Sequence, residues 1–124
     1  MSKRTFLTFS LRIDATEPLQ TVKARVEAAL GCGLQGGSFA GVPALVGEIL
    51  GMQIGLLLWR GIGGAYVYQL HGCSDQRTLH NVEWDEIRID CAIIDLLRQK
   101  GAGEWRQPTS EEHRAEGNYD LEDV

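Results

Sequence analysis

The chain has 124 residues, of which 44% are hydrophobic and 23% charged, and its net charge at pH 7 is −5. This length suits one domain with one hydrophobic core, and the composition excludes a wholly disordered chain. No apolar run approaches the roughly 20 residues of a membrane helix, and no apolar signal segment follows the Met-Ser-Lys-Arg start, so we expect a cytoplasmic protein without membrane contact.

The first third of the chain predicts a strand, a helix and a glycine-rich turn region. Apolar and polar residues alternate over Thr5–Ile13, which is the period of a half-buried strand. Thr16 can then cap a helix whose first turn contains Pro18 and whose apolar residues continue at helical spacing to a stop at Gly31. The glycines that follow permit turns or a bulged strand around Ser38–Phe39.

The middle of the chain predicts further strands. Val42–Leu50 and Met52–Trp59 are rich in branched apolar residues, which indicates two strands or one long bent strand. A buried helix over Ala44–Leu50 is the competing interpretation, because periodicity does not separate the two in a short run. Gly61–Gly64 predicts a hairpin turn before another antiparallel strand at Ala65–Leu70.

The last third predicts a loop, an extended segment, a helix and a tail. A polar loop at residues 72–81 precedes an extended segment over Val82–Ile89, after which Asp90 can cap a helix over Cys91–Lys100 that stops at Gly101. From Gln107 onward the chain has six acidic residues and few apolar ones, the composition of a mobile tail.

These elements predict an α+β fold: a mixed or antiparallel sheet of about five or six strands with two helices packed on it. Residues 1–106 form the predicted single domain, and residues 107–124 form the predicted acidic, flexible tail. Cys32, Cys73 and Cys91 are odd in number and widely spaced, so we expect reduced and mostly buried thiols in place of a disulfide framework.

Charge is unevenly distributed along the chain. Residues 1–82 have seven Lys/Arg and five Asp/Glu, whereas residues 83–124 have five and twelve, which gives net charges of +2 and −7. The field of the acidic third disfavours nucleic acid as its partner and favours a cationic protein surface.

Sites for catalysis and cofactors have weak support in the sequence. Cys73 with His71 or His80, oriented by Asp75, is the least implausible nucleophilic arrangement, although an inert buried cysteine is the more common state of that residue type. His71 and Cys73 lack the spacing of a structural zinc site. We therefore predict no metal, no cofactor and no catalytic residue.

The strongest hint of function is a cluster of acidic and aromatic residues in the predicted extended segment. Tryptophan is enriched at the centres of protein interfaces, and exposed carboxylates speed docking onto a basic partner. The alternative interpretation is that the tryptophans are core or rim residues and the carboxylates a solvated face. The predicted partner-binding residues are Asp75, Glu83, Trp84, Asp85, Glu86 and Trp105.

Several segments resemble those of a known protein family. Leu-Gly-Met-Gln-Ile at 50–54, Tyr-Gln-Leu at 68–70, Ile-Asp-Cys-Ala-Ile-Ile-Asp-Leu-Leu at 89–97 and Gly-Ala-Gly-Glu-Trp at 101–105 resemble small bacterial immunity proteins of contact-dependent growth inhibition and related polymorphic toxin systems. The resemblance covers residues 5 to 106 and its motifs are structural.

This resemblance implies that the protein binds the C-terminal toxin domain of a sibling cell and blocks its active site. Such toxin domains are often nucleases with basic clefts, for which an acidic surface can replace phosphate charge. The expected function is therefore stoichiometric toxin neutralisation without catalysis. Two alternatives stay open: a small enzyme using Cys73 and His71, and a self-associating structural or chaperone-like protein that pairs through an exposed edge of the strands in Val42–Trp59.

Overall fold

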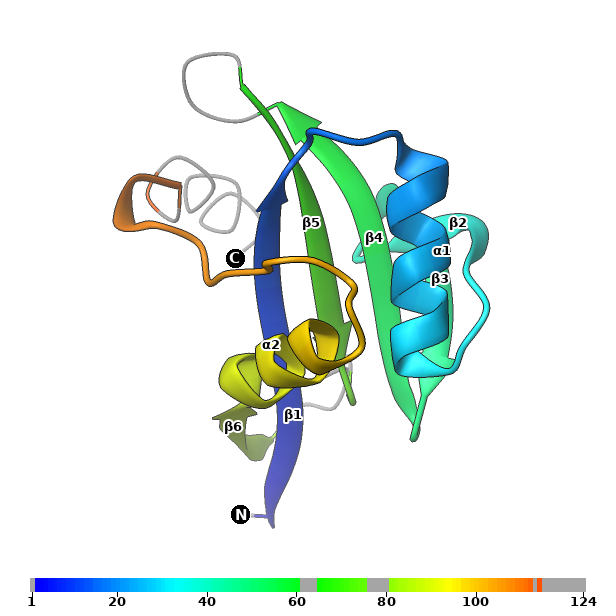
Figure 1. Ribbon diagram of the computed structural model, residues 1–124. Coiled ribbons are helices and arrows are strands. Elements are labelled where there is room, and N and C mark those ends of the chain that lie inside the picture. The colour runs from blue at the N-terminus through cyan, green and yellow to red at the C-terminus, as the bar shows by residue number, and fades with distance from the viewer. Residues whose placement is uncertain (1, 61–64, 76–80, 113, 115–124) are drawn as a thin grey trace.

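The computed structural model shows a six-stranded mixed sheet with two helices on one of its faces (Figure 1). It describes residues 2–60, 65–75, 81–112 and 114. The strands lie in the order β2-β3-β4-β5-β1-β6. The elements are β1 (Ser2–Asp14), α1 (Leu19–Leu30), β2 (Gln35–Phe39), β3 (Val42–Ile49), β4 (Met52–Arg60), β5 (Tyr66–Cys73), β6 (Val82–Arg88) and α2 (Asp90–Gln99). The predicted α+β class is confirmed.

The first strand, β1, connects the antiparallel strands of the sheet to β6. The alternating pattern predicted over Thr5–Ile13 forms β1, which is antiparallel to β5 on one side and parallel to β6 on the other. The parallel pairing is possible because the chain passes through the other strands between β1 and β6. It brings the acidic segment of the last third beside the N-terminal strand.

Two tight hairpins build the other half of the sheet. The segment Val42–Trp59 forms two separate antiparallel strands, so the alternative of a helix over Ala44–Leu50 is wrong. Leu50 and Gly51 make the turn with φ of 47° and 78°, the left-handed conformation of two-residue hairpin loops. The turn predicted at residues 61–64 lies outside the described residues, as do residues 76–80 of the predicted loop.

The core lies between the sheet and the two helices. Alternate residues of β1 and β4, such as Leu11 and Leu56, are fully buried against Val26 of α1 and Leu97 of α2. Burial of each such side chain contributes about 1.5–3 kcal/mol. Both α1 and α2 therefore cover the same face of the sheet, and we call the opposite face, which neither of them covers, the helix-free face (Figure 1).

Helix ends follow the predicted stops but not the predicted caps. Gly31 ends α1 in the left-handed conformation, and Gly101 follows the C-cap of α2 with φ of 71°. Neither helix has a side-chain cap at its N-terminus, so the capping roles expected of Thr16 and Asp90 are wrong. Asp90 is instead buried, and its Oδ1 accepts the backbone N–H of Ser10 at 2.8 Å.

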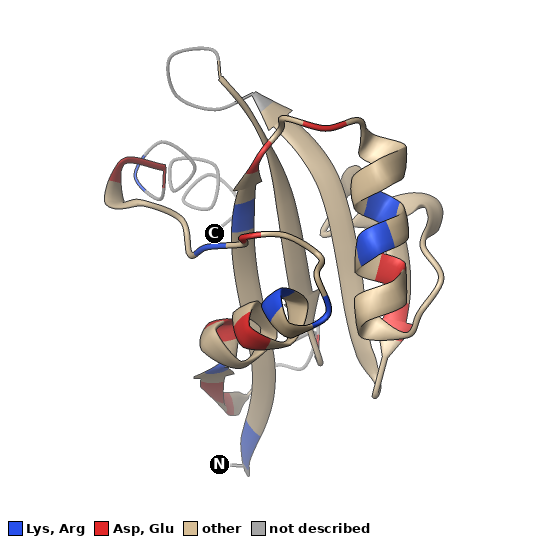
Figure 2. Ribbon diagram, viewed as in Figure 1, with Lys and Arg blue, Asp and Glu red and all other residues tan. Residues whose placement is uncertain are grey.

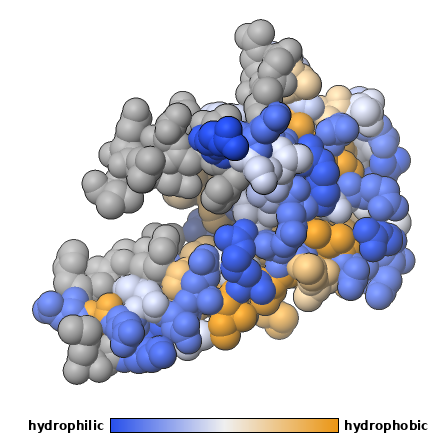
Figure 3. All heavy atoms as spheres, turned by 90° about the vertical axis from the view of Figure 1, so that its left-hand side faces the viewer, coloured by the Kyte–Doolittle hydropathy of each residue, from blue (hydrophilic) through white to orange (hydrophobic). Residues whose placement is uncertain are grey.

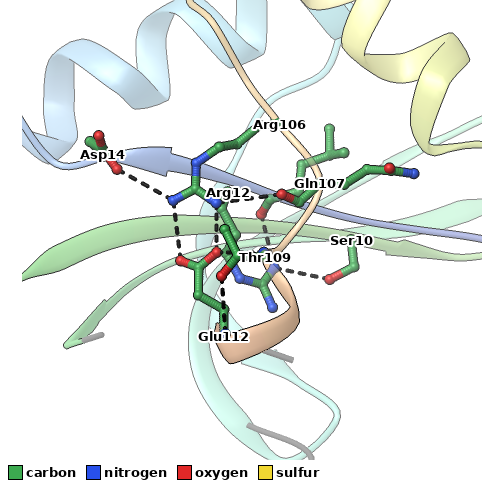
Figure 4. A network of polar contacts seen from close by, with 8 residues as sticks. Ser10, Arg12, Asp14, Arg106, Gln107, Thr109 and Glu112 are labelled. Carbon is green, nitrogen blue, oxygen red and sulfur yellow. Dashed lines mark hydrogen bonds and ion pairs between the residues drawn. The ribbon is translucent and has the colours of Figure 1, made fainter. Parts of the chain in front are cut away.

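The chain after Trp105 continues to contact the domain past the predicted boundary at residue 106. Thr109 and Glu112 form a capping box, in which the Glu112 carboxylate accepts the Thr109 N–H at 2.8 Å and the Thr109 hydroxyl accepts the Glu112 N–H at 3.1 Å. Arg106 binds both Glu112 oxygens and also lies 3.4 Å from Asp14 (Figure 4). The Thr-Ser-Glu-Glu spacing is the sequence signal for this anchor. The flexibility predicted for the rest of the tail concerns residues outside the described part.

The three cysteines differ in how far they are buried. Cys32 and Cys73 are half-buried and Cys91 is exposed; all three are free, so burial was predicted correctly only in part. Across the described residues, neither helix is both long and apolar enough to cross a membrane.

Candidate partner-binding site

The acidic and aromatic cluster forms β6, one of the two edge strands of the sheet. Its inner side pairs with residues 2–8 of β1 in parallel register, with Trp84 opposite Arg4 and Asp85 opposite Thr5. In Figure 1 this pair of strands runs past α2 toward the N-terminus. We call these two segments, residues 2–8 and 82–88, the β1–β6 ladder.

Trp84 lies on the helix-free face of the ladder and is half-buried. Its ring packs edge-on against buried Phe6, with centroids 5.7 Å apart, and the Arg4 guanidinium lies 5.9 Å from its centroid. Arg4 is also 3.7 Å from the carboxylate of Asp75. The predicted residues Asp75 and Trp84 are thus brought together, although Arg4, which connects them, was not predicted.

The three acidic residues of β6 are exposed and divide between the two faces of the ladder. Glu83 and Asp85 point to the helix side, and Glu86 points to the same side as Trp84. Glu86 accepts a hydrogen bond from the Thr8 hydroxyl at 2.8 Å. Asp85 lies 4.0 Å from the Lys3 ammonium, and more than half of each side chain is exposed, so this pair contributes at most a few tenths of a kcal/mol.

Trp105 does not belong to this surface, so the prediction that it contacts a partner is wrong. Its side chain is 2% exposed, and its indole N–H donates to the Ala102 carbonyl at 3.1 Å. A tryptophan enclosed in the core presents no area to a partner. Its sequence neighbour Glu104 remains exposed and pairs with Arg98 at 3.3 Å.

The molecular surface around β6 and α2 has both acidic and apolar side chains. Acidic residues occur on β6 and on α2 (Figure 2). The space-filling view of this side is mainly hydrophilic, with apolar patches within it (Figure 3). Leu7 and Ile87, which are register partners in the ladder, are 36% and 46% exposed. Sequence reasoning missed this pair because only the parallel pairing places the two residues together.

The alternative site at His71 lies elsewhere, on the helix-free face of β5. Nε2 of its ring is 2.9 Å from Gln69 Oε1, an acceptor, and its Nδ1 is 3.1 Å from the Ser10 hydroxyl. The proton therefore belongs on Nε2, and Nδ1 accepts from Ser10. Burial first, and then the positive charge of Arg12, lower the pKa of His71 to about 4, so the ring is neutral at pH 7 and a weak base.

Cys73 and His71 do not form a nucleophile–base pair. The Cys73 thiol donates to the Asp75 carbonyl at 2.8 Å, whereas both ring nitrogens of His71 bond to other residues. Cys73 does line an open groove of about 590 Å³, together with Glu48 and Gln53, but His71 does not. Among the described residues, Cys73 therefore has no histidine base beside it. The other predicted base, His80, lies outside the described residues.

The strand edges in Val42–Trp59 that were predicted to pair with a second copy are already paired within the chain. β3 pairs with β2 on one side and β4 on the other, and β4 also pairs with β5, so both apolar strands of Val42–Trp59 are internal. Within the described ranges, no three or more His, Cys, Asp or Glu residues lie together as metal ligands would.

Comparisons of the chain with known protein families, characterised proteins and solved structures found no match.

Proposed function

We propose that this protein is an immunity protein that neutralises a cognate toxin domain by stoichiometric binding. The observation that carries the proposal is the exposed acidic edge of the sheet, where Glu83, Asp85 and Glu86 flank half-buried Trp84. Strand backbone holds these groups in fixed positions, so little conformational entropy is lost when a partner binds. The resemblance of several segments to immunity proteins supports the same function.

The charge distribution favours a basic partner surface. Residues 83–124 have a net charge of −7, and the ion pair that Lys3 makes with Asp85 is too exposed to neutralise this region. A nuclease cleft is lined by cationic groups that bind phosphate. Carboxylates at the spacing of a rigid strand can occupy such a cleft and exclude the nucleic acid, and this inhibition requires neither turnover nor a cofactor.

Titration of the purified protein with the toxin domain encoded beside it tests the proposal. A catalytically inactive form of the toxin domain serves as the probe, and isothermal titration is run at two salt concentrations. We expect one-to-one binding with a nanomolar dissociation constant, about −12 kcal/mol, that weakens as salt is added. No binding at either salt concentration would remove the immunity function.

Charge reversal measures the electrostatic contribution. The double variant Asp85→Lys and Glu86→Lys is expected to associate about tenfold more slowly and with weaker salt dependence, because the steering field is reduced. A double reversal outside the ladder, Asp95→Lys and Glu104→Lys, at side chains 65% and 80% exposed, makes the same change in net charge. Equal slowing by the two double variants would assign the effect to net charge and not to β6.

A further inference from the structure

The β1–β6 ladder has a second face, on the side of the sheet where α1 and α2 lie. Trp84 lies on the opposite face. The side chains of the second face are all exposed, and none of them is among the residues of the core beneath α1 and α2 in the described part of the chain. They form a small array of two adjacent strands: Lys3, Thr5 and Leu7 from β1, and Glu83, Asp85 and Ile87 from β6. We call this array the open face.

The opposite side of the ladder already has partners within the chain. Phe6 is 2% exposed beneath Trp84, Arg4 contacts both Trp84 and Asp75, and Glu86 accepts the Thr8 hydroxyl. A partner that docked on this side would have to compete with those contacts. Among the described residues, the side chains of the open face make no such contact apart from the exposed Lys3–Asp85 pair.

The open face has an apolar end and an acidic end. Leu7 and Ile87 lie opposite each other at the end nearer α2, and Glu83 and Asp85 lie toward the start of β6. Adjacent exposed apolar side chains favour a desolvated contact, while carboxylates beside them favour a cationic rim on the partner. With Lys3 included, the face has a net charge of −1, so a cationic partner surface complements it better than a second copy does.

We infer that the open face is the surface on which the cognate toxin domain docks, with an apolar side chain of the toxin on Leu7 and Ile87 and a basic group at Glu83 and Asp85. This inference rests on the proposed function and makes it more specific. It assigns the contact to one face of β6 and assigns Trp84 and Glu86 to holding the ladder together.

Two pairs of matched variants, titrated with the same inactive toxin domain, test the assignment. Glu83→Lys and Glu104→Lys make the same charge change, the first on the open face and the second at a side chain that is 80% exposed outside the ladder. Ile87→Thr and Leu58→Thr both remove an apolar group while keeping a residue that suits a strand, at sites 46% and 47% exposed. We expect Glu83→Lys and Ile87→Thr each to weaken binding at least tenfold, and the other two variants to stay within about twofold of wild type.

The outcomes separate this assignment from the proposed function. If wild type binds but Glu104→Lys weakens binding as much as Glu83→Lys does, or if all four variants bind like wild type, the open face is wrong and the immunity function stands. If wild type does not bind, both fail. Circular dichroism and thermal unfolding establish that each variant is folded, and Thr5→Lys, an exposed open-face change that leaves Ile87 in place, serves as a second probe if Ile87→Thr is unstable.

Discussion

His71 is a titratable side chain whose surroundings change its protonation. Phe39 stacks on its ring at 5.8 Å, and a Cβ on Gly55 would lie 2.7 Å from Phe39, so a glycine at this position allows the β2–β3 hairpin to fold over the helix-free face. Ser10, hydrogen-bonded to Arg12 at 2.9 Å, donates to the ring from β1. The ring is half-buried, hydrogen-bonded at both nitrogens and neutral, which suits a structural role.

The lowered pKa of His71 makes stability depend on pH. Because its folded-state pKa is about 4 and its ordinary value is 6.5, the unfolded chain binds the proton more tightly. The contribution of neutral His71 to the free energy of unfolding is fully present above pH 6.5. It is lost as the pH falls toward 4, by about 2–3 kcal/mol at most. Urea unfolding at pH 4.5 and 7 should show a smaller change for His71→Gln than for wild type; an equal change in both proteins would contradict the assignment.

Leu50 is a second residue in an unusual environment. It has a φ of 47° in the β3–β4 turn, and its side chain is fully exposed, so no packing compensates the strained backbone. Leu50→Asn should raise the free energy of unfolding by about 1 kcal/mol, since asparagine tolerates the left-handed conformation. Urea unfolding measures this change, and Leu50→Ala should have little effect. A similar gain from alanine would mean that the exposed side chain, and not the backbone, causes the instability.

At the scale of elements, Asp90 joins three segments at the edge of β1. β6 pairs with β1 as far as Thr8, and Arg106 pairs with Arg12 further along. Between them the carboxylate of Asp90 accepts the Ser10 N–H, and it also binds Arg88 at 3.0 Å. The side chain thus completes an edge that no strand covers at this point.

Removal of this carboxylate should be costly. Asp90→Ala leaves the Ser10 N–H without its acceptor and is expected to lower the free energy of unfolding by about 2–3 kcal/mol. Asp95→Ala in the same helix is the control, because the Asp95 side chain is 65% exposed and its loss should change stability by less than about 0.5 kcal/mol. Equal effects in urea unfolding would show that Asp90 acts only through helix formation.

At the scale of the whole molecule, stability should decrease from the centre of the sheet to its edges. β4, β5 and β1 have neighbours on both sides and supply most of the core, whereas β2 and β6 are edge strands with exposed residues. Amide hydrogen exchange should be slowest in β5 and in the middle of β1, and much faster in β2 and β6. Uniform protection across the six strands would contradict this order.

Local physics made much of the fold predictable. Alternating residues in β1, glycine stops after both helices and turn residues between β3 and β4 act through the backbone of the residues concerned, so a single chain reveals them. The predicted site was only partly recovered. The strand with Glu83 to Glu86 is exposed as expected, whereas Trp84 and Trp105 have the same side chain and only burial distinguishes them.

The sequence by itself determined the class of fold, the positions of most strands and helices, and the acidic character of the last third. Only the tertiary structure decided that β6 pairs in parallel with β1, that Asp90 binds a strand and not its own helix, and which side chains share the open face. These outcomes depend on competition for burial and hydrogen bonds between segments about 80 residues apart. Sequence periodicity indicates the backbone conformation of a segment, but it does not indicate which distant segment that segment contacts.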